Sequence, residues 1–146
     1  MTSPKRRLLI ADDHAPVGKS LKALLEPEYD VLGLVANGAE VLESVRRARP
    51  EALLLDLWMP GRNGLDLLTD LHQEFPEVRV VVLTMHADLV VAVEAMHRGA
   101  QAYLLKDSGY AELEEALREV FNGKSYLSPR INVEPNRTIY RDQGSY

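Results

Sequence analysis

The stretch that decides the fold is Ala-Leu-Leu-Leu-Asp-Leu-Trp-Met-Pro-Gly, residues 52–61. Four apolar residues run directly into the carboxylate of Asp56, and Pro60 and Gly61 then interrupt any regular structure. The apolar run is too short for a helix and shows no polar alternation, so it predicts a central parallel strand that is buried on both faces. Open parallel sheets bind ligands outside the carboxyl ends of their strands, and Asp56 stands at such an end.

Four other apolar runs resemble this one, and helical patterns separate them. Strands are expected at residues 8–11, 31–36, 52–55, 78–83 and 102–105. The intervening helices have apolar faces within residues 17–25, 41–48, 65–75, 88–98 and 113–121. This alternation predicts an α/β protein with a flavodoxin-like, doubly wound, five-stranded parallel sheet of order 2-1-3-4-5 and five helices.

The composition narrows the class of protein. The 146 residues suit one domain, and 46% hydrophobic and 27% charged residues are ordinary for a globular protein. A formal net charge of -5 argues against a nucleic-acid-binding face, and the absence of cysteine excludes disulfides and thiolate metal sites. The apolar run at 8–11 is too short for a signal peptide, and no run approaches membrane-spanning length, so we expect a cytoplasmic protein without a membrane partner.

The chain changes character after Gly123. Residues 124–146 contain Pro129 and Pro135 and show no apolar period, so we expect a linker or C-terminal tail after a domain of residues 7–123. The tail holds four basic and two acidic residues, too small an excess for sequence-specific DNA binding. We therefore expect this chain not to bind nucleic acid directly.

Polar side chains follow four of the five predicted strands: Asp12 and Asp13, Asp56, Thr84, and Lys106. In the predicted order the first and third strands are neighbours, so the three carboxylates converge. Carboxylates a few ångströms apart repel by about 4 kcal/mol per pair at an effective dielectric of about 20. Oxygen ligands of this kind indicate Mg²⁺, and a lysine with a hydroxyl beside them suits a phosphoryl group.

Each residue also has a simpler interpretation. Asp12 or Asp13 could cap the following helix, Asp56 could cap the turn before Pro60, and Lys106 could be a solvated surface residue. Their common position at one edge of the sheet favours a shared site. The four histidines lack the pairwise spacing of metal ligands, so no chemistry is assigned to them.

This set of residues resembles the receiver domain of two-component response regulators, over about residues 7–123. The motifs that carry the resemblance are Asp12-Asp13, Asp56 with Met59-Pro60-Gly61, Thr84, and Lys106. Finer features at 12–14, 83–86 and 99–107 are similar to the NarL/FixJ-type subgroup.

The resemblance implies a signalling domain rather than an enzyme, one that assists its own phosphorylation and dephosphorylation. Asp56 would accept a phosphoryl group from a sensor histidine kinase. Asp13, Asp56 and the main-chain carbonyl of Trp58 would hold Mg²⁺, with Asp12 assisting through water.

The same resemblance assigns the switch. Lys106 would pair with the phosphoryl group, Thr84 would hydrogen-bond to it, and Tyr103 would be the aromatic switch residue. The subgroup also implies a possible homodimer through the first and fifth helices. Its members usually continue into a helix-turn-helix domain and control transcription, but residues 124–146 show no counterpart of that domain.

The sequence allows alternatives for the helix at 88–98 and for the function. The apolar helix at 88–98 is either a mobile partner-binding face or simply packed more deeply than its neighbours. A small Mg²⁺-dependent phosphohydrolase with an aspartate nucleophile is an alternative function, although the haloacid dehalogenase type needs a second Asp where Trp58 stands. A flavin-binding module of the same fold would need a phosphate-cradling loop in place of Asp12-Asp13-His14.

Overall fold

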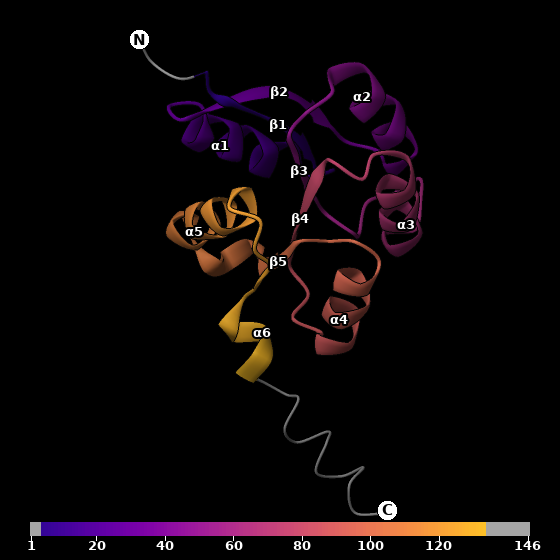
Figure 1. Ribbon diagram of the computed structural model, residues 1–146, viewed down its shortest axis with the longest axis vertical. Coiled ribbons are helices and arrows are strands. Elements are labelled where there is room, and N and C mark those ends of the chain that lie inside the picture. The colour runs from indigo at the N-terminus through magenta and orange to yellow at the C-terminus, as the bar shows by residue number, and fades with distance from the viewer. Residues whose placement is uncertain (1–3, 134–146) are drawn as a thin grey trace, which may run out of the picture.

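The computed structural model describes residues 4–133 of the chain. A parallel sheet forms the middle layer, with α1 and α5 on one face and α2, α3 and α4 on the other (Figure 1). The strands are β1 (Arg6–Ala11), β2 (Tyr29–Val35), β3 (Ala52–Leu55), β4 (Arg79–Thr84), β5 (Ala102–Leu105) and β6 (Tyr126–Leu127). The α-helices are α1 (Ala15–Leu25), α2 (Val41–Ala48), α3 (Gly64–Glu74), α4 (Leu89–His97), α5 (Tyr110–Phe121) and α6 (Pro129–Val133), with 3-10 turns η1 (Gly38–Glu40) and η2 (Lys106–Ser108).

The strand order is β2-β1-β3-β4-β5-β6, and every neighbouring pair is parallel. The predicted flavodoxin-like order 2-1-3-4-5 is confirmed. The expected number of elements is corrected, because β6 and α6 lie in the segment predicted as a tail. A two-residue strand and a five-residue helix are too short to produce a visible apolar period. The remaining predicted tail, 134–146, lies outside the described residues.

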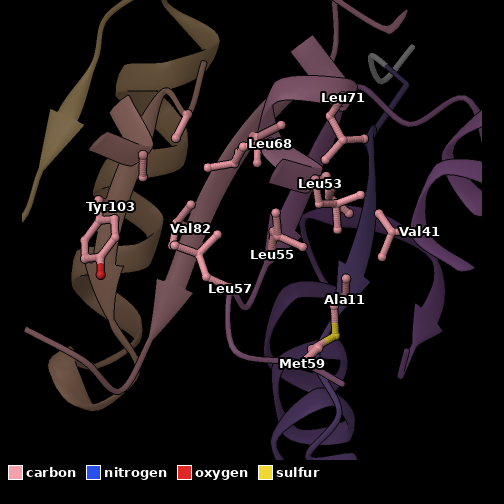
Figure 2. Close-up of a cluster of buried hydrophobic side chains, with 14 of the residues drawn as sticks. Ala11, Val41, Leu53, Leu55, Leu57, Met59, Leu68, Leu71, Val82 and Tyr103 are labelled. Carbon is pink, nitrogen blue, oxygen red and sulfur yellow. The ribbon is translucent and has the colours of Figure 1, made fainter. Parts of the chain in front are cut away.

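The residues of β3 show why a continuous apolar run marks a central strand. Leu53 and Leu55 pack against one core, and Ala52 and Leu54 pack against the other. All four are at most 1% exposed. Figure 2 shows the first core extending from Val41 past Leu53 and Leu55 to Tyr103 on β5.

The loop after β3 is fixed by close backbone packing. A Cβ atom on Gly64 would lie 2.3 Å from the carbonyl oxygen of Leu57, so the first turn of α3 can approach the loop only with glycine there. The side chain of Asn63 caps α3 by accepting from the amides of Leu65 and Asp66, at 2.9 and 3.1 Å. The loop that carries Trp58 is therefore held at the carboxyl edge of the sheet.

Helix α4 begins after Asp88, whose side chain accepts from the amide of Val90 at 2.9 Å. Ala92 is buried, while Val90 is 74% and Val93 47% exposed. This supports an exposed apolar face on α4 over uniformly deeper packing. Within residues 4–133, every helix is too short or too polar to span a lipid bilayer.

Candidate functional site

The backbone places two carboxylates at the same edge of the sheet. Just past β1, the amide of Asp12 donates to the Val35 carbonyl at 2.8 Å; just past β3, the amide of Asp56 donates to the Ala11 carbonyl at 3.0 Å. Both aspartates are 7% exposed, whereas Asp13 is exposed. One oxygen from each of the three aspartates lies within 4.8 Å of the others. The predicted convergence is confirmed.

Lys106 joins the two buried carboxylates. Its Nζ lies 2.7 Å from Asp12 Oδ2 and 2.9 Å from Asp56 Oδ2, and its side chain is only 10% exposed. Burial by itself lowers the pKa of Lys106, but the hydrogen bonds to Asp12 and Asp56 outweigh it and leave that pKa raised. Three carboxylates around one ammonium keep a negative excess, which suits a divalent cation.

The remaining oxygens of these carboxylates accept from the chain two residues further on. Asp12 Oδ1 accepts from the amide of His14 at 2.8 Å, and Asp56 Oδ1 accepts from the amide of Trp58 at 3.0 Å. The helix-cap interpretation is wrong, because His14 is the N-cap residue of α1 and has no side-chain cap bond. The turn interpretation of Asp56 is confirmed by its bond to the Trp58 amide, and the same residue also belongs to the acidic cluster.

The two predicted switch residues meet at His86. Thr84 is fully buried at the end of β4, and its hydroxyl accepts from the amide of His86 at 3.3 Å. The fully buried Tyr103 donates its hydroxyl to the carbonyl of His86 at 3.0 Å. Burial, with smaller contributions from Asp88 and Asp56, raises the pKa of Tyr103 to about 12. The hydroxyl is therefore protonated and acts as a donor near neutral pH.

Sequence reasoning missed His86. Its ring lies against Trp58, with ring centroids 4.5 Å apart at an interplanar angle of 49°. Trp58 is 52% exposed and lines a cleft of about 540 Å³ beside Asp13. His86 acts through its main chain and this ring contact, so a search for metal-ligand spacing had no signal that could find it. The position of the Trp58 carbonyl at the metal site stays a prediction.

Comparison with known proteins matches this arrangement. A family model described as the response regulator receiver domain matches residues 8–118. The chain belongs to this family. The receiver domain is 34% identical over 129 residues to the transcriptional regulatory protein DegU of Brevibacillus brevis, covering 87% of this chain and 55% of the relative. It is 31% identical over 130 residues to the oxygen regulatory protein NreC of Staphylococcus carnosus, covering 87% and 60%.

A solved structure agrees with the sequence relatives. The crystal structure of a two-component response regulator of the LuxR family, from Aurantimonas sp. SI85-9A1, is 29% identical to this receiver domain with a TM-score of 0.85. The match covers 93% of this chain and 99% of that one. The predicted family, with its NarL-type subgroup, is confirmed, and a signalling domain is favoured over the phosphohydrolase alternative. The chain spans little more than half the length of the two curated relatives described above.

Proposed function

We propose that Asp56 accepts a phosphoryl group from a sensor histidine kinase, with Mg²⁺ bound beside it. The observation that carries the proposal is the bridge from Lys106 to two buried carboxylates, with a third within 4.8 Å. The ammonium of Lys106, already bonded to the carboxylates, can pair with the negative oxygens of a phosphoryl group on Asp56.

The strand order supports Asp56 over Asp12 as the acceptor. Both have one oxygen on Lys106 and the other on a backbone amide, so contacts alone do not separate them. Strand β3, however, lies between β1 and β4. Asp56 thus stands between the acidic pair after β1 and the hydroxyl of Thr84 at the end of β4, whereas Asp12 is one strand further from Thr84.

The donor set fits Mg²⁺. The three aspartates offer only hard oxygen atoms, and Mg²⁺ is usually held by a few carboxylates, waters and phosphate. Asp13, Asp56 and the main-chain carbonyl of Trp58 would hold the ion, with Asp12 assisting through water. When bound, the ion supplies positive charge to the phosphoryl oxygens during transfer.

The residues of the site divide the chemistry between them. The carboxylate of Asp56 attacks the phosphorus atom of the phosphohistidine in line, and the phosphorus–nitrogen bond breaks. The amide of Trp58 and the ammonium of Lys106 orient the attacking carboxylate. Lys106 then pairs with the transferred phosphoryl group. Later attack of water at that phosphorus breaks its bond to the Asp56 oxygen, releases inorganic phosphate and regenerates the Asp56 carboxylate.

The switch proposal uses the same geometry. The Thr84 hydroxyl moves from the amide of His86 to the new phosphoryl oxygens. The ring of Tyr103, already fully buried and bonded to the His86 carbonyl, is stabilised in that position. This conformation passes the signal to a downstream output, which in full-length relatives of this subgroup is transcription.

Acetyl phosphate with Mg²⁺ tests the acceptor assignment. Intact mass should show one base-labile phosphoryl group on the wild-type protein and none on Asp56→Asn. Asp12→Asn is the matched variant, because it removes the charge from the equivalent carboxylate bonded to Lys106 but keeps the acceptor. Labelling that survives in Asp56→Asn but is lost in Asp12→Asn would transfer the role to Asp12.

The protein partners follow from the same proposal. Helices α1 and α5 lie on one face of the sheet (Figure 1). They border an apolar cleft of about 370 Å³, and Leu24 in its lining is 50% exposed. We expect this face to serve the homodimer, and light scattering with and without a phosphoryl mimic measures it. Direct binding to duplex DNA is not expected, and a sequence-selective gel shift at physiological ionic strength would contradict this.

A further inference from the structure

The chain beyond α5 returns to the sheet and forms a C-terminal strap, residues 126–133, which comprises β6 and α6. The amide of Tyr126 donates to the Gln101 carbonyl at 2.9 Å, and the amide of Ser128 donates to the Tyr103 carbonyl at 3.0 Å. The strap therefore extends the sheet along the edge of β5.

The strap also enters the hydrophobic core. Ile131 is fully buried and belongs to the same core cluster as Tyr103 and the α4 residues Ala92 and Ala95. Leu127 packs against this cluster, and α6 packs against α4. Figure 2 shows Tyr103 at one end of that cluster. Since Ser128 bonds to the Tyr103 carbonyl and Ile131 shares the cluster, the strap lies over the core beside the predicted switch residue.

Two side-chain contacts hold the strap at its ends. The hydroxyl of Tyr126 donates to Glu112 Oε2 on α5 at 2.7 Å. Arg130 pairs with Asp107 at 3.2 Å, and both of these side chains are more than half exposed. The first contact is partly buried and joins the strap to α5, whereas the second is a surface ion pair that contributes little.

A continuous series of contacts links the strap to the acceptor. The amide of Ser128 donates to the Tyr103 carbonyl at 3.0 Å, and the Tyr103 hydroxyl donates to the His86 carbonyl at 3.0 Å. The His86 ring lies 4.5 Å from the Trp58 ring, measured between centroids. The Trp58 amide donates to Asp56 Oδ1 at 3.0 Å. The series runs without a gap from the strap to the acceptor.

We propose that docking of the C-terminal strap and occupation of Asp56 by a phosphoryl group favour each other. The inference rests on the proposed function of Asp56. The strap covers the core beside Tyr103 and bonds to its main chain, so it stabilises the buried position from which the hydroxyl reaches His86. Phosphorylation favours the same position, and two events that select one conformation are positively coupled.

The coupling makes the strap an element that responds to the state of Asp56. Its affinity for the α4–β5 surface rises when Asp56 is occupied. Residues 126–133 are then held more firmly against the receiver domain. Because coupling is reciprocal, complete release of the strap weakens binding at Asp56 by the same factor by which occupation of Asp56 strengthens strap docking.

The test titrates beryllofluoride with Mg²⁺ and follows the fluorescence of Trp58, the chain's single tryptophan. Ile131→Ser, which loosens the strap far from the site, should raise the apparent Kd for beryllofluoride by roughly fivefold or more. Arg130→Ala is the matched control in the same segment and should change the apparent Kd less than twofold. Tyr126→Phe, which keeps the apolar packing, should raise the apparent Kd, as Ile131→Ser does.

A second measurement needs no variant. Amide exchange of residues 126–133 in the wild-type protein should slow on adding beryllofluoride, by a factor at least as large as the change in Kd caused by Ile131→Ser. Unchanged exchange together with unchanged Kd in folded Ile131→Ser overturns the coupling while leaving the acceptor assignment intact. Failure of wild-type protein to bind beryllofluoride overturns the proposed function, and the coupling with it.

Discussion

Asp13→Asn should make the receiver domain more stable than wild type without Mg²⁺ and less stable than wild type when Mg²⁺ is in excess. Lys106 already bonds to Asp12 and Asp56, but Asp13 forms no ion pair among residues 4–133. Without a cation, its charge adds repulsion to the site. With Mg²⁺ bound, the same carboxylate is a ligand, so its removal has the opposite effect.

The size of the effect follows from the charges. Asp13 faces two carboxylates and one ammonium, which leaves one unit of negative charge uncompensated. At 4.8 Å this repulsion is roughly 0.9 kcal/mol in the dielectric of water and roughly 3.5 kcal/mol at an effective dielectric of about 20. Because Asp13 is exposed, the lower value applies, and a gain of about 1 kcal/mol corresponds to roughly 3 to 5 °C in Tm.

The loss in Mg²⁺ should exceed this gain. If removing one ligand weakens Mg²⁺ binding about tenfold, about 1.4 kcal/mol of Mg²⁺-dependent stabilisation is lost at a given free concentration. The order of the two melting temperatures should therefore reverse between EDTA and excess Mg²⁺.

Thermal melts of both proteins in EDTA and in Mg²⁺ measure the reversal. Asp30→Asn is the control, because Asp30 is an exposed aspartate at the start of β2, away from the cluster. It should shift Tm equally in both buffers. If Asp13→Asn melts below wild type in EDTA, the repulsion argument is refuted.

Three further predictions concern the surrounding structure. Lys106→Met should cost about 3 kcal/mol in urea melts without Mg²⁺, because it leaves two buried carboxylates without their cation, and Mg²⁺ should restore part of the loss. The pKa of Tyr103 is raised to about 12 from an ordinary 10.0, so this residue stabilises the fold below pH 10, and that stabilisation is lost as the pH rises from 10 to 12. Thermal melts of Tyr103→Phe should therefore show a smaller loss of stability across that range. At neutral pH the variant should be less stable than wild type, because its bond to the His86 carbonyl is absent. Gly64→Ala should cost about 1–3 kcal/mol by chemical denaturation, since its methyl group would overlap the Leu57 carbonyl, and an unchanged midpoint would contradict the packing described for that loop.

The sequence alone determined the sheet and the edge at which the site lies. The run of residues 52–55 has no polar position, and its short length before Pro60 and Gly61 favours a strand covered on both faces over a helix. Strands that alternate with helices must be parallel, so their carboxyl ends share one edge. That is why the convergence of Asp12, Asp13 and Asp56 could be predicted without coordinates.

Only the tertiary structure decided how these groups are connected. Lys106 bridges both buried carboxylates because β5 and β1 bring residues distant in sequence to one edge, and no local pattern specifies such a contact. His86 acts through its carbonyl oxygen, which every residue possesses, so its residue type gave no signal. The C-terminal strap is too short for a period to appear, and its fold depends on the edge of β5 and the core beside Tyr103. Periodicity reports which face of an element is buried, whereas packing alone determines which distant residues meet there.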